Sequence, residues 1–383
     1  MLIGCLVKLM ANQKMSTRLY HFRLVLSFVL AAFYMISAQA EIFIATAGPF
    51  TGTNIFRGEQ IQHGAEMAVA DINARGGVLG EQVELLIADD ACDPEQAVAV
   101  AHKLVNDGVV FVAGHVCSHS SIPASRVYRD AGVLMISPAS TNPKLTDEGG
   151  DNVFRVCGRD DHQGVVAGNY LSDVWRDKNI AIIHDSSTYG KGLADETRKQ
   201  LTKRGVTTAL EETFTPGVRD YSQLVEKMQA ASIDVIYVGG YTEETGLMVR
   251  QARDRDYAAQ FVTGDALTNE EFWLITGKAG EGTLGTFGPD PRDFEAAASV
   301  VARFRDKGFE PSGYTLHTYA AVQAWAQATE KAGTLALDKV IESLRYEQFD
   351  TVLGEISFDG NGDVTAPGYI WYMWTNGNYV PLP

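Results

Sequence analysis

The sequence has few positively charged residues for its length. Its 383 residues contain 32 Lys and Arg against 48 Asp and Glu, which gives a net charge of −16. A chain this acidic is repelled by phosphate backbones and anionic lipid headgroups, so we expect neither nucleic acid nor a membrane surface as a partner. Cysteine is also scarce, with four residues, and His and Cys do not occur at the spacing of a metal site. We therefore expect no metal and no cofactor.

The sequence also lacks recognisable catalytic motifs. No Gly-x-Ser-x-Gly segment surrounds Ser118, as a hydrolase nucleophile would require. The segment around Lys191 lacks the pattern of a phosphate-binding loop. The run Asp359–Asp363 begins like a calcium loop but has neither Gly at the sixth position nor Glu at the twelfth, which favours an ordinary turn. These absences predict a protein that is not an enzyme.

After residue 40 no apolar run is long enough to span a bilayer, whereas residues 1–40 have the composition of a secretory signal peptide. They contain Lys and Arg but no Asp or Glu, then an apolar core at Leu24–Ser37 that is too short to span a bilayer. Small residues at Ala38 and Ala40 match the pattern that signal peptidase cleaves. We expect translation to start at Met1 or Met15, cleavage after Ala40, and an exported product without a membrane anchor.

Export changes the interpretation of the cysteines, because disulfides form outside the cytoplasm. Cleavage would remove Cys5 and leave Cys92, Cys117 and Cys157. Cys92 and Cys117 both follow apolar strands, in neighbouring turns, so we expect them to form a disulfide that closes a loop of about 25 residues. Cys157 is expected to be a small buried residue with a free thiol.

The stretch Val109–Ser121 organises the expected fold. Its apolar, β-branched first half ends at Gly114 and is followed by small polar residues, which predicts a buried parallel strand and a loop at its carboxyl end. In open α/β sheets that edge binds ligands. The hydroxyl and backbone N–H groups of Ser118, Ser120 and Ser121 would lie near the start of the next helix, where they suit a carboxylate.

The same alternation of apolar strand, polar loop and amphipathic helix runs through the chain. It predicts an α/β fold of two doubly wound parallel sheets, with a ligand cleft between two lobes and a hinge of several crossovers. The expected N-terminal lobe comprises 41–158 and 289–365, and the C-terminal lobe comprises 159–288 and 366–383. The expected strands are Ile42–Ala47, Val83–Ala88, Val109–Ala113, Val133–Ser137, Ile180–His184, Asp234–Val238, Gln260–Thr263, Gly354–Phe358 and Tyr369–Trp374. The expected helices are Gly58–Ala74, Pro94–Asn106, Ala124–Ala131, Val165–Arg176, Leu193–Arg204, Glu244–Arg255, Ala296–Lys307, Thr315–Lys331 and Leu337–Arg345.

Several short motifs occur in a characteristic order. They are Gly64-Ala65-Glu66 with Asp71–Gly77, then Asp89–Pro94, Gly114–Ser118, Ile136–Thr141, His184-Asp185 with Tyr189-Gly190, and Gly239-Gly240-Tyr241. Together they resemble the type I periplasmic binding proteins, and within them the leucine/isoleucine/valine-binding receptors of ABC importers. The resemblance covers essentially all of the chain after residue 40.

The resemblance implies a binding site for a zwitterion. Ser118 and Thr141 would bind the ligand carboxylate, the carbonyl of Ala139 would accept from the ligand ammonium, and Asp265 would pair with that ammonium from the second lobe. Tyr189 and Tyr241 would close over the ligand. The full expected ligand-binding set is Val116, Ser118, Ala139, Ser140, Thr141, Tyr189, Tyr241 and Asp265.

The resemblance further implies a monomeric periplasmic protein that captures a neutral aliphatic amino acid by lobe closure and delivers it to an inner-membrane ABC permease. Two features depart from the family pattern: Asp265 replaces a longer Glu, and Phe56-Arg57 stands where an aromatic residue directly precedes the equivalent of Gly58. Because Asp265 is the shorter acid, the expected range of ligands extends to γ-aminobutyrate. The same residue would repel acidic amino acids. A periplasmic sensor of the same fold is the alternative, and a secreted hydrolase a distant third.

Overall fold

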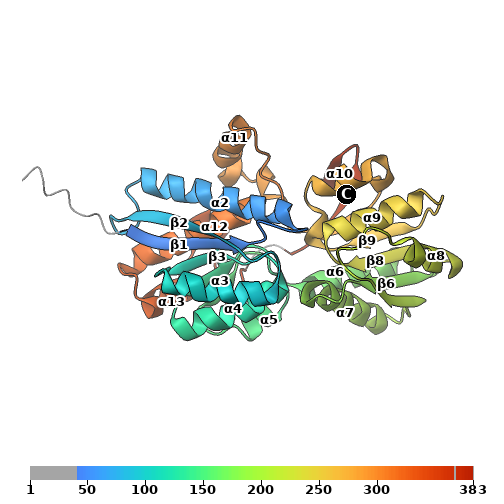
Figure 1. The fold of residues 1–383 in the computed structure, drawn as a ribbon, viewed down its shortest axis with the longest axis horizontal. Coiled ribbons are helices and arrows are strands. Elements are labelled where there is room, and N and C mark those ends of the chain that lie inside the picture. Colours follow the sequence, from blue (N-terminus) through green and yellow to red (C-terminus); the bar gives the residue numbers. More distant parts are fainter. Residues whose placement is uncertain (1–40, 366–367, 383) are drawn as a thin grey trace, which may run out of the picture. The chain divides into compact units, whose positions relative to one another are not determined.

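The computed structural model describes residues 41–365 and 368–382. The predicted leader and its cleavage site lie outside the described residues. Ile42–Pro383 form one compact unit, built from two large sheets whose covering helices complete what we call the first and second lobes (Figure 1). None of the helices in the described ranges is long and apolar enough to cross a membrane.

The first lobe is built on a five-stranded sheet with the order β2-β1-β3-β4-β5. Strands β1 and β3, β3 and β4, and β4 and β5 pair in parallel. The strand order reverses beside β1, which is where doubly wound sheets bind ligands. The strands are β1 (Glu41–Gly48), β2 (Gln82–Asp89), β3 (Phe111–Gly114), β4 (Leu134–Ser137) and β5 (Val153–Arg155). The helices of this lobe are α2 (Ile55–Ala74), α3 (Pro94–Asn106), α4 (Ser118–Ala131), α5 (Lys144–Asp147), α11 (Ala298–Asp306), α12 (Thr315–Ala332) and α13 (Leu337–Tyr346), with the short β11 (Phe349–Thr351) and β12 (Gly354–Ile356) beside them.

Both faces of this sheet are buried, and β3 shows how its residues divide between them. Phe111 and Ala113 belong to the apolar cluster formed with α2 and α12, where the Phe111 ring stacks on Trp325 with centroids 5.0 Å apart. Val112 points to the opposite face and packs with residues of α3 and α4. This two-sided burial explains why the strand is a continuous apolar run in the sequence.

The second lobe is built on a seven-stranded sheet with the order β14-β13-β10-β9-β8-β6-β7. Its first five strands in the chain pair in parallel, whereas β13 lies antiparallel to both β10 and β14. The strands are β6 (Ile180–His184), β7 (Leu210–Thr213), β8 (Val235–Gly239), β9 (Gln260–Thr263), β10 (Leu284–Phe287), β13 (Ile370–Thr375) and β14 (Asn378–Pro381). The helices are α6 (Asp160–Val174), α7 (Thr188–Lys203), α8 (Ser222–Ala230), α9 (Thr242–Arg253) and α10 (Glu271–Thr276).

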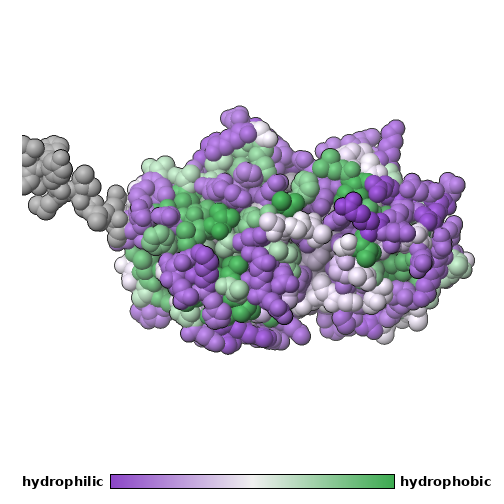
Figure 2. All heavy atoms as spheres, in the orientation of Figure 1, coloured by the Kyte–Doolittle hydropathy of each residue, from purple (hydrophilic) through white to green (hydrophobic). Residues whose placement is uncertain are grey.

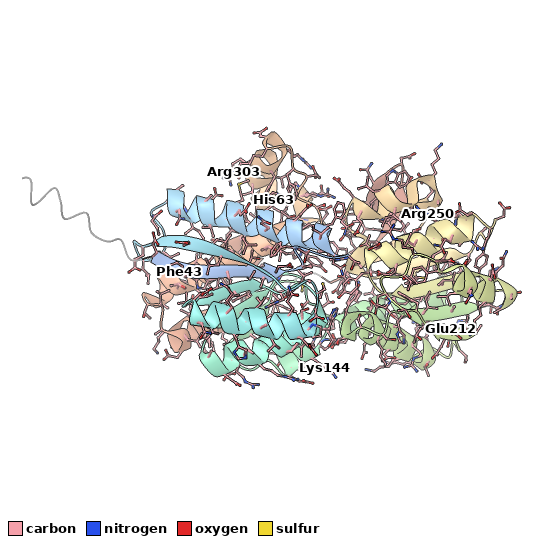
Figure 3. The ribbon with its side chains drawn as sticks, viewed as in Figure 1. Phe43, His63, Lys144, Glu212, Arg250 and Arg303 are labelled. Atoms are coloured by element: carbon pink, nitrogen blue, oxygen red, sulfur yellow. A yellow bond between two sulfur atoms is a disulfide. The ribbon has the colours of Figure 1, made fainter. Side chains whose placement is uncertain are left out.

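The face of the molecule in Figure 2 is largely hydrophilic, with hydrophobic areas between the polar ones. Charged side chains of both signs, such as Lys144, Glu212, Arg250 and Arg303, point outward (Figure 3).

The expected α/β class and the parallel sheets are confirmed, but several helices begin earlier than the sequence predicts, and two of these matter for the site. Helix α4 begins at Ser118 instead of Ala124, so the serines expected in a loop form its first turn. Helix α7 begins at Thr188 instead of Leu193, with Ser187 as its N-cap, whose hydroxyl accepts from the N–H of Gly190. Both first turns carry small or polar residues that are nevertheless buried, so hydrophobic periodicity could not reveal them.

The sequence does not predict some of the elements that the structure contains. These are strands β5, β7, β10 and β14 and helix α8. β5 has three residues and β7 and β10 four each, too short for a periodicity to stand out. The lobe boundaries given by the sequence stay a prediction.

Two chain crossings between the lobes lie side by side. The N–H of Arg155 donates to the carbonyl of Gly362, and the N–H of Val364 donates to the carbonyl of Arg155. The carboxylate of Asp363 pairs with the guanidinium groups of both Arg155 and Arg159. Because Arg155 and Asp363 are buried, this ion-pair cluster fixes the two crossings to one another. The turn that resembles the start of a calcium loop thus presents its last acid to two arginines.

The structure confirms the disulfide between Cys92 and Cys117, whose Cα atoms are 5.6 Å apart, and leaves Cys157 free and buried. We predict that replacing both Cys92 and Cys117 by Ser lowers the free energy of unfolding by about 3 kcal/mol, since the bridge restricts the unfolded chain. Urea denaturation of the mature protein, with and without dithiothreitol, measures this. The reductant should destabilise the wild type to the level of the double variant and leave the variant unchanged. A wild-type midpoint insensitive to reduction would contradict the prediction.

Candidate functional site: a buried cleft between two sheets

Two polar loops of the first lobe meet at the carboxyl ends of β3 and β4. Helix α4 begins at Ser118 directly after β3, while Ala139–Thr141 follow β4. The backbone N–H of Asn142 donates to the hydroxyl of Ser118 over 3.3 Å, which ties the two loops together. Ser118 and Thr141 are both buried. Because the first backbone N–H groups of a helix have no acceptor within it, this corner can receive a carboxylate.

Ser140 belongs to the predicted ligand set, but its hydroxyl is engaged inside the first lobe. It donates to the carbonyl of Val116 over 2.8 Å and contacts the hydroxyl of Ser121. Ser120 is also fully buried and does not face solvent. These contacts make Ser140 and Ser121 a brace between the two loops, with Val116 held at their junction.

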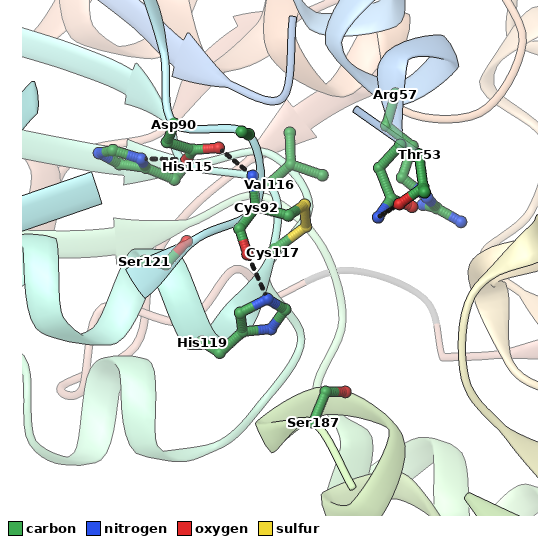
Figure 4. Close-up of a disulfide and its surroundings, with 12 residues drawn as sticks. Thr53, Arg57, Asp90, Cys92, His115, Val116, Cys117, His119, Ser121 and Ser187 are labelled. Atoms are coloured by element: carbon green, nitrogen blue, oxygen red, sulfur yellow. Dashed lines mark hydrogen bonds and ion pairs between the residues drawn. A yellow bond between two sulfur atoms is a disulfide. The ribbon is translucent and has the colours of Figure 1, made fainter. Parts of the chain in front are cut away.

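The Cys92–Cys117 disulfide also holds the loop that follows β3 and carries Val116 (Figure 4). Beneath it, Nδ1 of His115 lies 2.5 Å from Oδ2 of Asp90, and Nε2 of His115 lies 2.9 Å from the hydroxyl of Tyr128. The other oxygen of Asp90 accepts from the N–H of Cys92 over 2.8 Å. The turn that carries Cys92 and the start of α4 are therefore joined by a covalent bond and by a buried polar network.

From the second lobe comes Asp265, the first residue after the β9 strand and its Gly264. Its side chain is only 3% exposed. The hydroxyl of Tyr189 donates to Oδ1 over 2.9 Å, and the hydroxyl of Tyr314 contacts Oδ2. Tyr314 precedes α12 and so belongs to the first lobe. Hydrogen bonds to an ionised acceptor are strong, and here they orient a carboxylate from both sides of the cleft.

The predicted aromatic pair is also in place. The ring centroids of Tyr189 and Tyr241 are 5.1 Å apart, and the Tyr241 ring meets His119 of α4 edge-on at 6.3 Å. Burial raises the pKa of both tyrosines well above the usual value, so their hydroxyls stay neutral donors. One apolar cluster combines residues from both lobes, and its members at the cleft are Ile61, Val116, Ala139, Tyr189, Tyr241 and Ala266.

Two residues of this region were not predicted from the sequence. Tyr314 lies in a segment between expected elements, where nothing marked it as a partner of Asp265. Asp160 opens α6, five residues before the helix expected from Val165. It is fully buried, and no described donor meets hydrogen-bond geometry at either carboxylate oxygen. Its backbone N–H donates to the carbonyl of Thr141 over 2.9 Å. An acid at the start of a helix is normally exposed, so only tertiary structure could reveal this one.

The environment of Asp160 disfavours its ionised form. Burial raises its pKa well above the usual value, and the nearby charge of Asp265 adds to the effect, while the Thr141 hydroxyl opposes it. The folded protein therefore disfavours the ionised form of Asp160 more strongly than the unfolded chain does.

The raised pKa of Asp160 in the folded protein predicts that stability depends on pH. The carboxyl of Asp160 ionises near pH 3.9 in the unfolded chain but at higher pH in the folded one. The free energy of unfolding of the wild type should consequently fall, relative to Asp160→Asn, as the pH rises from about 4 through the raised pKa. Denaturant titrations at several pH values measure the difference, with the exposed Asp177→Asn as control. A wild-type-to-variant difference that stays constant over this range would refute the assignment.

Comparisons with known proteins agree with this architecture. A family model described as periplasmic binding protein matches residues 41–378. The chain is 47% identical over 350 residues to Leu/Ile/Val-binding protein homolog 1 of Brucella abortus, covering 90% of this chain and 94% of that one. It is 42% identical over 357 residues to a leucine-, isoleucine-, valine-, threonine- and alanine-binding protein of Pseudomonas aeruginosa, covering 92% and 95% of the two chains.

Solved structures show the same fold. The leucine-binding protein LivK of Thermotoga maritima superposes with a TM-score of 0.82 at 27% identity, covering 89% of this chain and 98% of that chain. A second similar structure is that of the branched-chain amino acid transporter substrate-binding protein LivJ of Streptococcus pneumoniae in complex with isoleucine. Its TM-score is 0.80 at 28% identity, and the match covers 90% of this chain and 100% of that chain. The chain accordingly belongs to the periplasmic binding protein family, in the branch whose members are named Leu/Ile/Val-binding proteins.

Proposed function

We propose that this protein is the periplasmic receptor of an ABC importer and binds a neutral aliphatic amino acid of the branched-chain type in the cleft. The observation that carries the proposal is that Ser118 and Thr141 of the first lobe and Asp265 of the second are all buried. One apolar cluster, with Val116, Tyr189 and Tyr241 among its members, joins the two lobes. Relatives that share 47% and 42% of their residues with this chain are named for leucine, isoleucine and valine.

The chemistry of the site suits a zwitterion. The hydroxyls of Ser118 and Thr141 and the N–H groups in the first turn of α4 donate to the ligand carboxylate, where the positive end of the helix dipole also favours an anion. Asp265, oriented by Tyr189 and Tyr314, pairs with the ligand ammonium together with the carbonyl of Ala139. Because Asp265 is one methylene shorter than Glu, the proposed range includes γ-aminobutyrate, whose ammonium lies further from its carboxylate.

The protein acts by binding and release, without catalysis. Ser118 would need a base to act as a nucleophile, but both ring nitrogens of His115 are engaged with Asp90 and Tyr128. Nε2 of His119 lies 2.6 Å from the carbonyl oxygen of Cys92, away from Ser118.

Release requires the lobes to separate, since the proposed site is buried between them. The partner that receives the amino acid is an inner-membrane ABC permease, and the receptor works as a monomer. It reaches the periplasm after cleavage behind Ala40.

Replacing Asp265 by Ala tests the proposed ammonium site. Removing one partner of a buried charge pair costs about 2–5 kcal/mol, so the affinity for leucine or valine should fall between about 30-fold and several thousand-fold. Isothermal titration calorimetry of ligand-free protein measures this, with the exposed Asp220→Ala as matched control. The wild type should also become more compact in small-angle X-ray scattering when ligand is added. Equal affinities of Asp265→Ala and wild type would overturn the assignment.

A further inference from the structure

Arg57 is a buried arginine that reaches from the first lobe to the second. It lies in the first turn of α2 and is 4% exposed; Figure 4 shows it across from the disulfide-bonded loop. Its Nη2 donates to the carbonyl of Ala266 over 2.6 Å and is 3.4 Å from the hydroxyl of Thr242. Ala266 directly follows Asp265, so the guanidinium lies next to the proposed ammonium site.

The guanidinium of Arg57 forms no ion pair with an acid in the described part of the chain. Its hydrogen-bond partners there, Ala266 and Thr242, are neutral, and its Nε is buried without a partner. Glu271 is the nearby acid that feels this charge. Burial raises the pKa of Glu271 to about 7, although Arg57 acts to lower it, so Glu271 is only partly ionised at neutral pH. A buried cationic donor left unpaired is costly unless a ligand supplies an acceptor.

The proposed pose directs the ligand side chain toward Arg57. With the ligand's carboxylate assigned to Ser118 and its ammonium to Asp265, the side chain is left to point toward the wall that carries Tyr241. On that wall the guanidinium carbon of Arg57 lies 5.4 Å from the centroid of the Tyr241 ring. Burial raises the pKa of both Tyr189 and Tyr241 while the charge of Arg57 opposes the rise, which places Arg57 within electrostatic reach of both hydroxyls.

The surroundings of Arg57 are polar. Thr242 and Asn269 are buried beside it, with the Asn269 amide nitrogen 3.4 Å from the Thr242 hydroxyl. The carbonyl oxygen of Asn269 has no partner in the described part of the chain. An all-carbon side chain placed against this group would leave Nε of Arg57 unsatisfied, whereas an oxygen at the same place would accept from it.

We propose that Arg57 is a specificity-determining residue, which makes the side-chain end of the cleft select neutral amino acids that carry a hydroxyl or amide oxygen. The inference rests on the proposed binding of a neutral amino acid, but it moves the preferred side chain from a purely aliphatic one to one that carries an oxygen. A neutral ligand fits because the charge of Arg57 is offset within the site by Asp265. A ligand with a second carboxylate would instead bring an extra negative charge close to Asp265 and Asp160.

Isosteric ligand pairs test this selection. Threonine and valine differ by a hydroxyl in place of a methyl, and asparagine and leucine differ in a similar way. In calorimetry of ligand-free wild type we expect threonine to bind at least about tenfold more tightly than valine, since a site built to hydrogen-bond an oxygen rejects the analogue that lacks it. Arg57→Met keeps the length of the side chain but loses its hydrogen-bond donors. It should lower the ratio of the affinity for threonine to that for valine to one or below. Arg57→Lys should keep part of the preference, and the exposed Arg126→Met should leave it unchanged.

The outcomes separate this inference from the function on which it rests. Equal binding of threonine and valine by the wild type, or a ratio unchanged in Arg57→Met, would overturn the role of Arg57 while amino-acid binding stands. A uniform loss for both ligands in Arg57→Met would also overturn it, because Arg57 would then only hold the lobes together. If no amino acid binds the wild type, the proposed function fails as well. Should Arg57→Met not fold by circular dichroism, Arg57→Lys carries the test.

Discussion

The placement of one carboxylate depends on both lobes of this protein. Asp265 is almost completely removed from water, and burying a charge is strongly unfavourable unless hydrogen bonds and a counter-ion compensate. The compensation comes from Tyr189 in its own lobe and Tyr314 in the other. Both lobes therefore hold this carboxylate at once, and in the proposed function a ligand ammonium would add a third partner to it.

Much of the fold could be predicted from the sequence, because a parallel sheet covered on both faces has strands that are continuous apolar runs. Val112 and Phe111 face opposite clusters, and both had to be apolar. The starts of α4 and α7 could not be predicted this way. Their first turns line the cleft with residues such as Ser118 and Tyr189, which are buried for the sake of the site and not of the core.

The difference between local sequence patterns and contacts made only in the tertiary structure also explains which parts of the site were predictable. Cys92 follows β2, and Cys117 and Ser118 follow β3. These two strands lie on either side of β1 in one parallel sheet, so the strand pattern sufficed to place both cysteines at the same edge. Asp160 and Tyr314 meet Asp265 only because separate chain segments converge, and no local pattern encodes that meeting. Arg57 stood out in the sequence as a departure, but its direction and its unpaired Nε required the structure.

The clamp formed by Asp363 with Arg155 and Arg159 restricts where the lobes can turn in the proposed closure. Because the clamp joins two adjacent crossings, bending would fall on residues outside it, such as the exposed Gly158 and Gly368. These two glycines would then be the pivot of that closure. In a lever of this kind the displacement grows with the distance from the pivot. A closure that moves Asp265 slightly would move the outer rims of the lobes much further, and a membrane partner could sense the filled receptor through those rims.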